Sequence, residues 1–363
     1  MKRKILILLA ILVVIIAAIA IYFTQKPKEP ETIKIGAILP LTGELSIFGN
    51  WLKEGIIVAS EDYKNIQFIF EDNKNQTSVA LSAFNKLIAV DNVKAVISAR
   101  TPVAYALAPL ALKSKVPILF TFADLPESIE GGVINFHFPL EDEIKFIAKS
   151  QEYLGDRAAV IVVNDEFGNL ALSLFKKYFE KDIVYIENFD PKQVDFRSIV
   201  EKIPRSTSFI FLVGYGQNLV ALIKTLAEKN INIPIVSVNS FINFYDLVKS
   251  YLKTPAYITM TLYNVNRGNE VLLSQIRSKF LRKFNKEPNV VNLEAFEATK
   301  FLIEILQKNK FDTKKVFEAI NTPQTISSIF GNLKLDNKGQ VHFPLVLAKI
   351  YKNKFEIIKI WEP

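Results

Sequence analysis

Short apolar runs rich in β-branched residues alternate with longer segments of helical periodicity, and this alternation limits the possible folds more than any other feature of the chain. A parallel connection between strands needs a crossover of a dozen or more residues, which is usually a helix. The alternation therefore predicts parallel sheets covered by helices on both faces. In residues 33–120 we expect strands at Ile33–Leu39, Ile66–Phe70, Ala95–Ser98 and Pro117–Phe120, separated by helices at Phe48–Tyr63, Ser78–Val90 and Val103–Lys113.

A second series with the same order of elements follows Phe138-Pro139. Its predicted strands are Ala158–Val163, Ile183–Glu187, Phe209–Val213 and Ile233–Val238, and its predicted helices are Asn169–Phe179, Phe196–Ile203 and Gln217–Lys229. Residues 268–319 are expected to be mainly helical, and residues 331–360 to form strands joined by turns at 337–339 and 352–354. This order predicts two α/β lobes. The cleft between them offers the strand carboxyl ends at which open α/β sheets bind ligands.

The composition excludes several classes of chemistry. The chain has no cysteine, which excludes disulfides, thiolate zinc sites, iron–sulfur clusters, cysteine nucleophiles and cysteine-linked lipid anchors. Its two histidines, His137 and His342, have no partner at a metal-binding spacing, and we interpret both as packing or surface residues. Neither a phosphate-binding Gly-x-x-x-x-Gly-Lys nor a Gly-x-Ser-x-Gly nucleophile motif occurs. We expect no metal site, no cofactor and no enzymatic activity.

The formal net charge of +8 does not indicate a nucleic-acid partner. Five of the 45 basic residues and one of the 37 acidic residues lie in residues 1–30, which leaves 40 against 36 in the rest of the chain. No block of lysine and arginine with interleaved aromatic residues follows residue 30. Nucleic acid is therefore not an expected partner.

The N-terminus carries a membrane-directed segment. Ile5–Phe23 comprises nineteen residues without a charge, and a helix of that length nearly matches a hydrocarbon layer of about 30 Å. Lys2, Arg3 and Lys4 precede it, so the rest of the chain is expected outside the cytoplasm. We favour an uncleaved anchor in residues 1–24, and a signal peptide cleaved near Ala18-Ile19-Ala20 is the alternative. Residues 25–31 form a Pro-rich linker.

The segment that follows the linker carries a specific motif. In residues 33–63, a strand ends in Pro40-Leu41-Thr42-Gly43, the pair Phe48-Gly49 opens a helix, and the amphipathic stretch Trp51–Tyr63 follows. This order resembles the first motif of the type I solute-binding proteins of ABC transporters, the branched-chain amino-acid-binding group. The resemblance continues through residues 70–77, 96–124, 161–175 and 331–340, and so extends over most of residues 32–363.

The resemblance implies the type I periplasmic-binding-protein fold, in which two doubly wound, Rossmann-like lobes are joined by three hinge crossings. The crossings would fall near Phe138–Leu140, Leu262–Val265 and Ser327–Phe330. The first lobe would then comprise residues 32–138 plus 265–326, and the second lobe residues 139–264 plus 327–363. Ligand would close the lobes about these crossings.

The resemblance also implies a ligand site on the first lobe. The family holds a ligand carboxylate at the start of the third helix, where Arg100-Thr101 stands here, and a helix N-terminus does attract anions. Alternatively, Thr101 is simply the N-cap and Arg100 is solvated. Phe122-Ala123-Asp124 replaces the family's Ser-Ala-Thr, so Ala123 and Asp124 are expected at the ligand, although Asp124 would also suit a cap on the turn before Pro126.

On the second lobe, the resemblance places three residues at the ligand. Phe167 precedes Gly168 where the family has Tyr-Gly, Tyr215 follows a strand, and Asn239 replaces an acid that binds the ligand ammonium in amino-acid binders. Phe48, with Phe122, Phe167 and Phe241, favours a less polar or aromatic ligand, while core packing is the alternative for each phenylalanine.

Together these expectations define a function. The chain would be an extracytoplasmic solute-binding protein that closes on a small molecule, an amino acid or related carboxylate or amide, and delivers it to an ABC transporter permease in the membrane. The alternative is a ligand-sensing receptor ectodomain of the same fold that acts through a membrane partner. A hydrolase that uses cleft carboxylates such as Asp124 is disfavoured, because it would need an activated water and a second acid at a fitting distance and the sequence shows no such pair. The acids at 141–143 are expected to complement a helix dipole.

Overall fold

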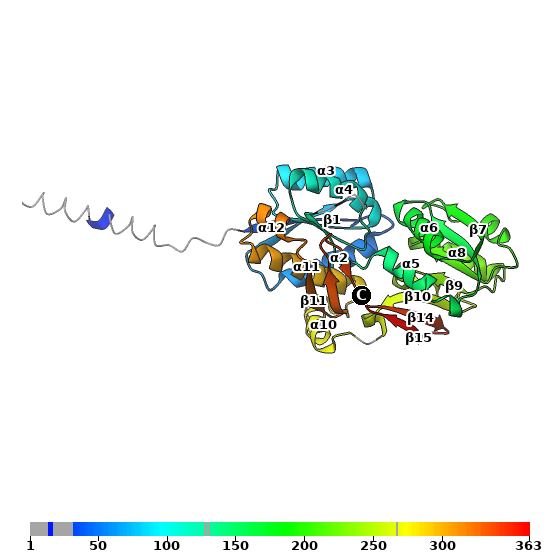
Figure 1. Cartoon of the computed structure of the whole chain (residues 1–363). Helices are drawn as coiled ribbons and strands as arrows, with labels where there is room; N and C mark the ends of the chain where they lie inside the picture. The colour runs from blue at the N-terminus through cyan, green and yellow to red at the C-terminus, as the bar shows by residue number, and fades with distance from the viewer. Residues whose placement is uncertain (1–13, 17–31, 127–128, 130, 266–267) are drawn as a thin grey trace, which may run out of the picture.

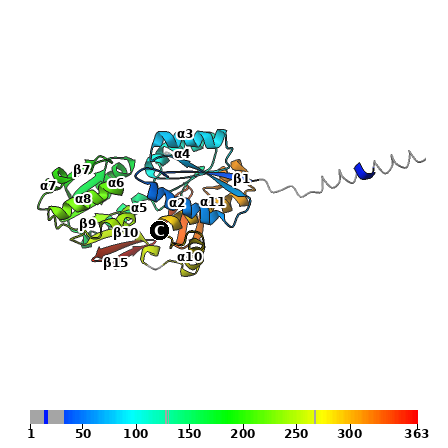
Figure 2. The same ribbon diagram turned by 180° about the vertical axis from the view of Figure 1, so that it is seen from behind.

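The computed structural model describes residues 14–16, 32–126, 129, 131–265 and 268–363. Two α/β bodies lie side by side, and the chain passes from the first to the second, returns to the first and ends in the second (Figures 1 and 2). We call the body built on the five-stranded sheet the first lobe and the body built on the seven-stranded sheet the second lobe. The doubly wound α/β architecture expected from the sequence is present in both lobes.

The first lobe has a fully parallel sheet with the strand order β2-β1-β3-β4-β5. Its strands are β1 (Ile33–Leu39), β2 (Ile66–Asp72), β3 (Val96–Ala99), β4 (Ile118–Thr121) and β5 (Val133–Asn135). Its helices are α2 (Ser46–Ser60), α3 (Thr77–Ala89), α4 (Thr101–Ser114), α10 (Glu270–Phe284), α11 (Val290–Lys308) and α12 (Thr313–Ala319). Helices α3 and α4 cover one face while α2 and α11 cover the other, so the central strands are apolar on both sides.

The second lobe has a mixed sheet with the strand order β15-β14-β10-β9-β8-β6-β7, in which β14 and β15 are antiparallel. Its strands are β6 (Arg157–Val163), β7 (Asp182–Phe189), β8 (Phe209–Val213), β9 (Ile235–Ser237), β10 (Ala256–Thr261), β14 (Leu345–Tyr351) and β15 (Lys354–Trp361). Its α-helices are α5 (Leu140–Ala148), α6 (Glu166–Tyr178), α7 (Arg197–Glu201), α8 (Gly216–Glu228) and α9 (Tyr245–Val248), and its 3₁₀ helices are η1 (Gln151–Tyr153) and η2 (Asn239–Phe244). Helices α5 and α6 pack on one face, and α8 and α9 on the other.

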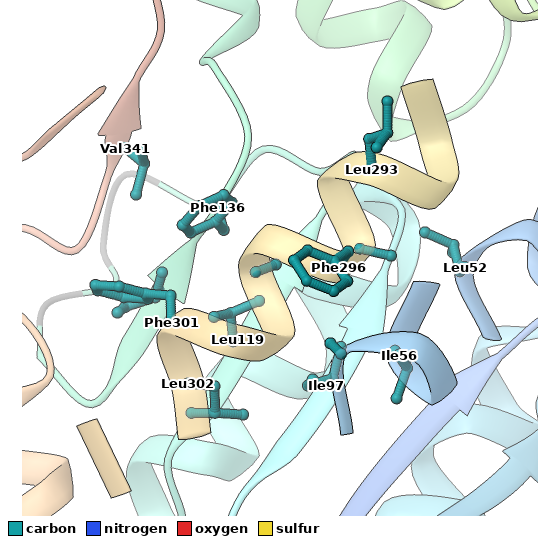
Figure 3. Packing of buried hydrophobic residues seen from close by; sticks show 14 of the residues in the cluster. Leu52, Ile56, Ile97, Leu119, Phe136, Leu293, Phe296, Phe301, Leu302 and Val341 are labelled. Atoms are coloured by element: carbon teal, nitrogen blue, oxygen red, sulfur yellow. The ribbon is translucent and has the colours of Figure 1, made fainter. Parts of the chain in front are cut away.

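A small antiparallel sheet is formed by residues that follow the first-lobe helix α12 and precede β14 in the sequence. It consists of β11 (Gln324–Ser328), β12 (Gly331–Leu335) and β13 (Val341–His342), and the 3₁₀ helix η3 (Leu262–Val265) precedes α10. Leu333, Leu335 and Val341 pack in the same hydrophobic cluster as Phe301 of α11. Figure 3 shows Val341 facing this cluster. The small sheet therefore contributes side chains to the core of the first lobe.

The predicted elements differ from the structure mainly at three strands. β1 and β8 occupy the residues predicted for them, and the helices begin or end within a few residues of their expected positions. β5, β10 and β11 were not among the predicted strands, and β5 has only three residues, too few to show a pattern. The predicted N-terminal helix Ile5–Phe23 lies outside the described residues except for Val14–Ile16. Within the described part of the chain, no helix combines the length and hydrophobicity needed to cross a membrane.

Helices α2 and α11 make the closest helix crossing in the first lobe. Leu52 and Ile56 of α2 face Leu293 and Phe296 of α11 (Figure 3). Gly55 stands at the crossing, where a Cβ atom would lie 2.3 Å from the Asn292 carbonyl oxygen and 2.8 Å from the Ala295 Cβ. Because one obstacle is a backbone carbonyl within a helix, it has little freedom to move. Gly55 therefore sets the distance between the two helices.

We expect Gly55→Ala to lower the free energy of unfolding by about 1–3 kcal/mol, because the added methyl group forces the helices apart. Urea denaturation of the full-length chain measures the change. Asn50→Ala, on the exposed side of the same helix, is the control and should change stability by less than about 0.5 kcal/mol. Equal stability of the Gly55→Ala variant and the parent would contradict the close packing at this crossing.

Candidate functional site

One pocket lies between the lobes, at the ends of the strands and the starts of the helices. Its cavity volume is about 90 Å³. Both lobes contribute to its wall, and all the residues predicted from the sequence line it: Phe48, Arg100, Thr101, Ala123, Asp124, Phe167, Tyr215 and Asn239. Phe122 also lines the pocket, whereas Phe241 is fully buried in the core of the second lobe.

Arg100 spans the pocket from the first lobe to the second. Its Nη2 atom lies 3.8 Å from Oδ2 of Asp165, and its guanidinium lies 4.8 Å above the ring of Tyr215. The Tyr215 hydroxyl donates to the same carboxylate, which also accepts from the Gly168 N–H at 3.0 Å and so caps α6. The side chains of Arg100 and Asp165 are each 12% exposed, so Arg100 is not solvated. Its charge is already paired with a carboxylate of the protein.

The backbone around Arg100 is strained. Arg100 has φ +79° and Phe122 has φ +49°, and both are in the region that favours glycine. They follow the neighbouring strands β3 and β4, and the Arg100 N–H donates to the Thr121 carbonyl at 3.3 Å. Such conformations persist where the surrounding structure holds them, and they cluster at ligand sites. The strain is consistent with a wall whose shape is fixed before a ligand arrives.

Thr101 and Asp124 are joined to each other and to the second lobe. The Asp124 N–H donates to Oγ1 of Thr101 at 3.1 Å, and Oδ1 of Asp124 accepts from the Leu140 N–H at 2.8 Å. Thr101 is thus the first residue of α4 and not its N-cap, and Asp124 caps α5 instead of the turn before Pro126. Burial raises the pKa of Asp124 to about 6, although the Leu140 N–H and the ring of His137 act in the opposite direction.

Glu143 is a pocket residue that sequence reasoning assigned to helix capping. Only 3% of it is exposed, and its Oε1 atom accepts from the Asn239 N–H at 2.6 Å and from the Thr259 hydroxyl. Burial raises the pKa of Glu143 to about 7, while these two hydrogen bonds act to lower it. Of the neighbouring acids, Glu141 does pair at the surface with Lys145. Glu143 lies one helical turn after Leu140, so its side chain points inward instead.

His137 was expected to be an ordinary packing or surface residue, but it forms a polar pair in the wall. Its Nδ1 atom lies 2.8 Å and 3.0 Å from the two carboxylate oxygens of Glu294, a residue of α11 that is 1% exposed. Burial raises the pKa of Glu294. For His137, burial acts to lower the pKa of the ring, but the carboxylates of Glu294, Glu143 and Asp124 together outweigh it and leave that pKa raised. The partners are 157 residues apart, so no sequence pattern signals the pair.

Aromatic rings form much of the remaining wall. Phe48 and Phe122 meet edge to face with ring centroids 5.3 Å apart, and Phe122 lies 4.7 Å from the ring of His137. Among the described residues, the buried Oγ of Ser240 and Oδ1 of Asn243 have no hydrogen-bond partner, and both residues line the pocket. Buried polar atoms almost always have partners in native proteins. These two atoms indicate a place where a bound molecule completes the hydrogen bonding.

In the part of the chain that the structure describes, no three histidine, cysteine or acidic residues are grouped so that they could hold a metal ion. The acids are instead held by backbone N–H groups and hydroxyls, as binding groups are. The arrangement suits reversible binding of a small molecule with an apolar body and a polar head.

Comparisons with known proteins agree with this architecture. The profile of the periplasmic binding protein family matches residues 32–354. Comparison with curated protein sequences gives no match. A leucine-binding protein, LivK, from Thermotoga maritima superimposes with a TM-score of 0.82 at 18% identity, covering 91% of this chain and 99% of that chain. LivJ, the branched-chain amino acid transporter substrate-binding protein from Streptococcus pneumoniae, in complex with isoleucine, gives 0.82 at 18% identity over 92% and 100%.

A third solved structure has a different kind of ligand. The solute-binding protein of an ABC transporter from R. palustris, in complex with 4-hydroxybenzoate, superimposes with a TM-score of 0.78 at 18% identity, covering 92% of this chain and 97% of that chain. The shared fold thus accommodates both amino acids and aromatic carboxylates in other proteins. At these identities the superpositions establish the fold and not the ligand.

Two doubly wound lobes around a shared pocket define a binding protein of the type I periplasmic class. The chain belongs to the periplasmic binding protein family, as its resemblance to the branched-chain amino-acid-binding group predicted. Proteins of this family bind solutes and are not enzymes. Membership of the family also implies a location outside the cytoplasm.

We expect the stability of the protein to fall as the pH rises from about 4.5 to about 7. In this range the folded state keeps a proton on Glu143 that the unfolded state, with a pKa near 4.5, has lost. Glu143→Gln keeps an acceptor for the Asn239 N–H but removes the titration. It should reduce the loss of stability across this range by on the order of 2–3 kcal/mol, measured by urea denaturation at several pH values.

The matched control for this measurement is Glu180→Gln, because Glu180 is exposed at the end of α6. Its stability profile should follow that of the parent protein at every pH. Parallel profiles for the Glu143→Gln variant and the parent would show that Glu143 does not titrate in the folded protein as its burial requires.

Proposed function

We propose that this chain is a solute-binding protein that closes its two lobes on a small molecule and delivers it to an ABC transporter permease. The observation that carries the proposal is the pocket itself, whose wall is shared by both lobes and bridged by Arg100 with Asp165 and Tyr215. Separating the lobes breaks the bridge and opens the pocket, so ligand occupancy and lobe closure are coupled. A permease that recognises the closed form thereby recognises the loaded form.

The proposed ligand class is an amino acid or a related small molecule of that size. LivK is a leucine-binding protein, LivJ was solved in complex with isoleucine, and the R. palustris protein was solved in complex with 4-hydroxybenzoate. Asn239 supplies no charge where amino-acid binders have an acid, but its N–H contacts the carboxylate of Glu143, which places an acid in the same part of the wall.

The lobes are proposed to move about three crossings. Phe138–Leu140, Leu262–Val265 and Ser327–Phe330 are the predicted segments, with lobe boundaries at 138/139, 264/265 and 326/327. The packing of β12 and β13 with α11 supports a later return to the second lobe, near the start of β14 at Leu345. We also propose that residues 1–24 tether the protein to the membrane, with cleavage near Ala20 as the alternative.

The direct test is a ligand screen of the full-length chain in mild detergent, by thermal shift, against amino acids, amines, carboxylates, amides and sugars. A ligand at ~100 times its Kd adds roughly 2.7 kcal/mol of stability, and any ligand found should also reduce the radius of gyration measured by small-angle X-ray scattering. Lobe closure by a bound small molecule supports the proposal. A protein whose lobes no compound closes, but which binds a membrane protein directly, would instead be a receptor ectodomain.

We expect Arg100→Met to weaken every ligand by about three- to tenfold, whatever the charge of that ligand, because it removes a bridge that exists only when the lobes are closed. Calorimetry measures the affinity, and scattering measures the open population without ligand. The control is Arg157→Met. Arg157 lies at the same distance of 3.8 Å from Asp182, but the two side chains are 46% and 73% exposed. Loss of affinity for carboxylates alone would instead place Arg100 on the ligand.

A further inference from the structure

The charges in the pocket wall do not balance. Arg100 is paired with Asp165, and these two charges cancel. His137 is paired with Glu294, and this pair is also neutral overall when it shares one titratable proton on the ring. Asp124 and Glu143 also line the pocket, at 8% and 3% exposure. Within the described residues, neither carboxylate has a cation within 4 Å. At a pH where Asp124 and Glu143 are deprotonated, the wall therefore carries an uncompensated negative charge that is shielded from bulk water.

The hydrogen bonding of these two carboxylates is also incomplete. Asp124 accepts through Oδ1 and Glu143 accepts through Oε1, whereas Oδ2 and Oε2 receive no hydrogen bond from the described part of the chain. The unpartnered Oδ1 of Asn243 adds a further acceptor, and the Ser240 hydroxyl can accept or donate. The pocket thus offers free hydrogen-bond acceptors to a bound ligand. A ligand group with several N–H donors and a positive charge can fill these hydrogen bonds.

The aromatic residues of the wall favour the same kind of group. Phe48, Phe122 and Phe167 line the cavity beside the carboxylates, and the faces of aromatic rings attract cations. The same rings provide apolar surface for the body of a ligand. A wall of carboxylates and aromatic rings binds a cation with an apolar body better than it binds an anion.

The start of α4, where a ligand carboxylate was expected, is poorly suited to bind an anion. Pro102, at the second position of α4, removes one of the N–H groups that a helix N-terminus would offer to an anion. The guanidinium of Arg100 is turned to Asp165, and the Thr101 hydroxyl already accepts from the Asp124 N–H. An anion placed there would also lie in the same pocket as two unpaired carboxylates.

We propose that the ligand of this pocket is a primary ammonium cation on a small aliphatic or aromatic body, and that a carboxylate on the ligand is not required. The inference rests on the proposed function, since it concerns the same pocket, and it narrows the ligand class. In this arrangement the ammonium group lies between Asp124 of the first lobe and Glu143 of the second lobe. Closure of the lobes around such a ligand brings both carboxylates to the same cation.

Two matched sets of compounds test the proposal by calorimetry on the full-length chain in mild detergent. The first set is 3-methylbutylamine, leucine and 4-methylpentanoate, and the second is 2-phenylethylamine, phenylalanine and 3-phenylpropanoate. In each set the apolar body is constant while the amine and carboxylate are removed in turn. In at least one set, we expect the amine to bind at least tenfold more tightly than the acid and no more weakly than the amino acid.

Substitution of the Glu143 carboxylate by an amide separates the effect of charge on amine affinity from the effect of a change in structure. Glu143→Gln should weaken the amine at least tenfold, because it removes the charge while keeping an acceptor for the Asn239 N–H. The control is Glu297→Gln, since Glu297 is also a buried glutamate, 4% exposed, and accepts a backbone N–H from Ile329, but it lies outside the pocket. The control should change amine affinity less than twofold. Equal affinities of the Glu143→Gln variant and the parent would overturn the proposal.

If the Glu143→Gln variant does not fold, Asp124→Asn and the pH dependence of the parent protein provide the same test. His137 acts on both carboxylates, and the neighbouring acids Glu141 and Asp142 act on Asp124. Arg100 and Tyr215 also line the pocket, where both contact Asp165, and Glu294 pairs with His137. As the pH falls from about 8 to about 5, Asp124 and Glu143 gain protons, so amine affinity should fall. Amine affinity that does not change over this range would contradict the proposal.

The outcomes distinguish this inference from the proposed function. If an amino acid binds tenfold more tightly than its amine, or a carboxylate alone closes the lobes, the solute-binding function stands and the amine inference is wrong. If no compound of either set or of the wider screen closes the lobes, the proposed function fails, and the inference fails with it.

Discussion

The parallel order of strands in both lobes is the constraint on which the site depends. Parallel strands end at one edge of a sheet, and the helices that follow them begin there, so loops, helix N-termini and strand ends gather at that edge. In this chain the edges of the two sheets face each other across one pocket. Residues as distant in sequence as Phe48 and Asn239 are brought together because each follows or opens an element at this edge.

Asp124 connects this geometry to the electrostatics of the pocket. Its N–H binds Thr101 in the first lobe and its carboxylate caps α5 in the second lobe, so a single residue joins both lobes at a crossing. The helix dipole stabilises a carboxylate at a helix N-terminus and so offsets part of the cost of burying the charge of Asp124. The pocket is consequently acidic for a structural reason, and the charge of any ligand must fit this wall.

The sequence predicted the fold and the residues that line the pocket better than the contacts that these residues make. Periodicity located β1 and β8, and the resemblance located the eight wall residues, because both depend on local patterns. The roles depend on partners from distant segments. Arg100 pairs with Asp165, and His137 pairs with Glu294, and no local pattern encodes either pair. Glu143 was expected to complement the helix dipole because it stands beside two other acids at the start of a helix. Its position in the helix instead places its side chain on the buried face.

The replacement of the expected acid by Asn239 has a physical counterpart in Glu143. The side chain of Asn239 carries no charge, but the backbone N–H of the same residue donates to a carboxylate from α5. Before closure, water can solvate Asp124 and Glu143 in the two separate lobes. Closure removes that water, and two buried carboxylates without a cation disfavour the closed state. A cationic ligand removes this penalty, whereas an empty pocket or an anion does not. If the proposed function is correct, the charge of the wall would couple lobe closure to the presence of a cationic ligand.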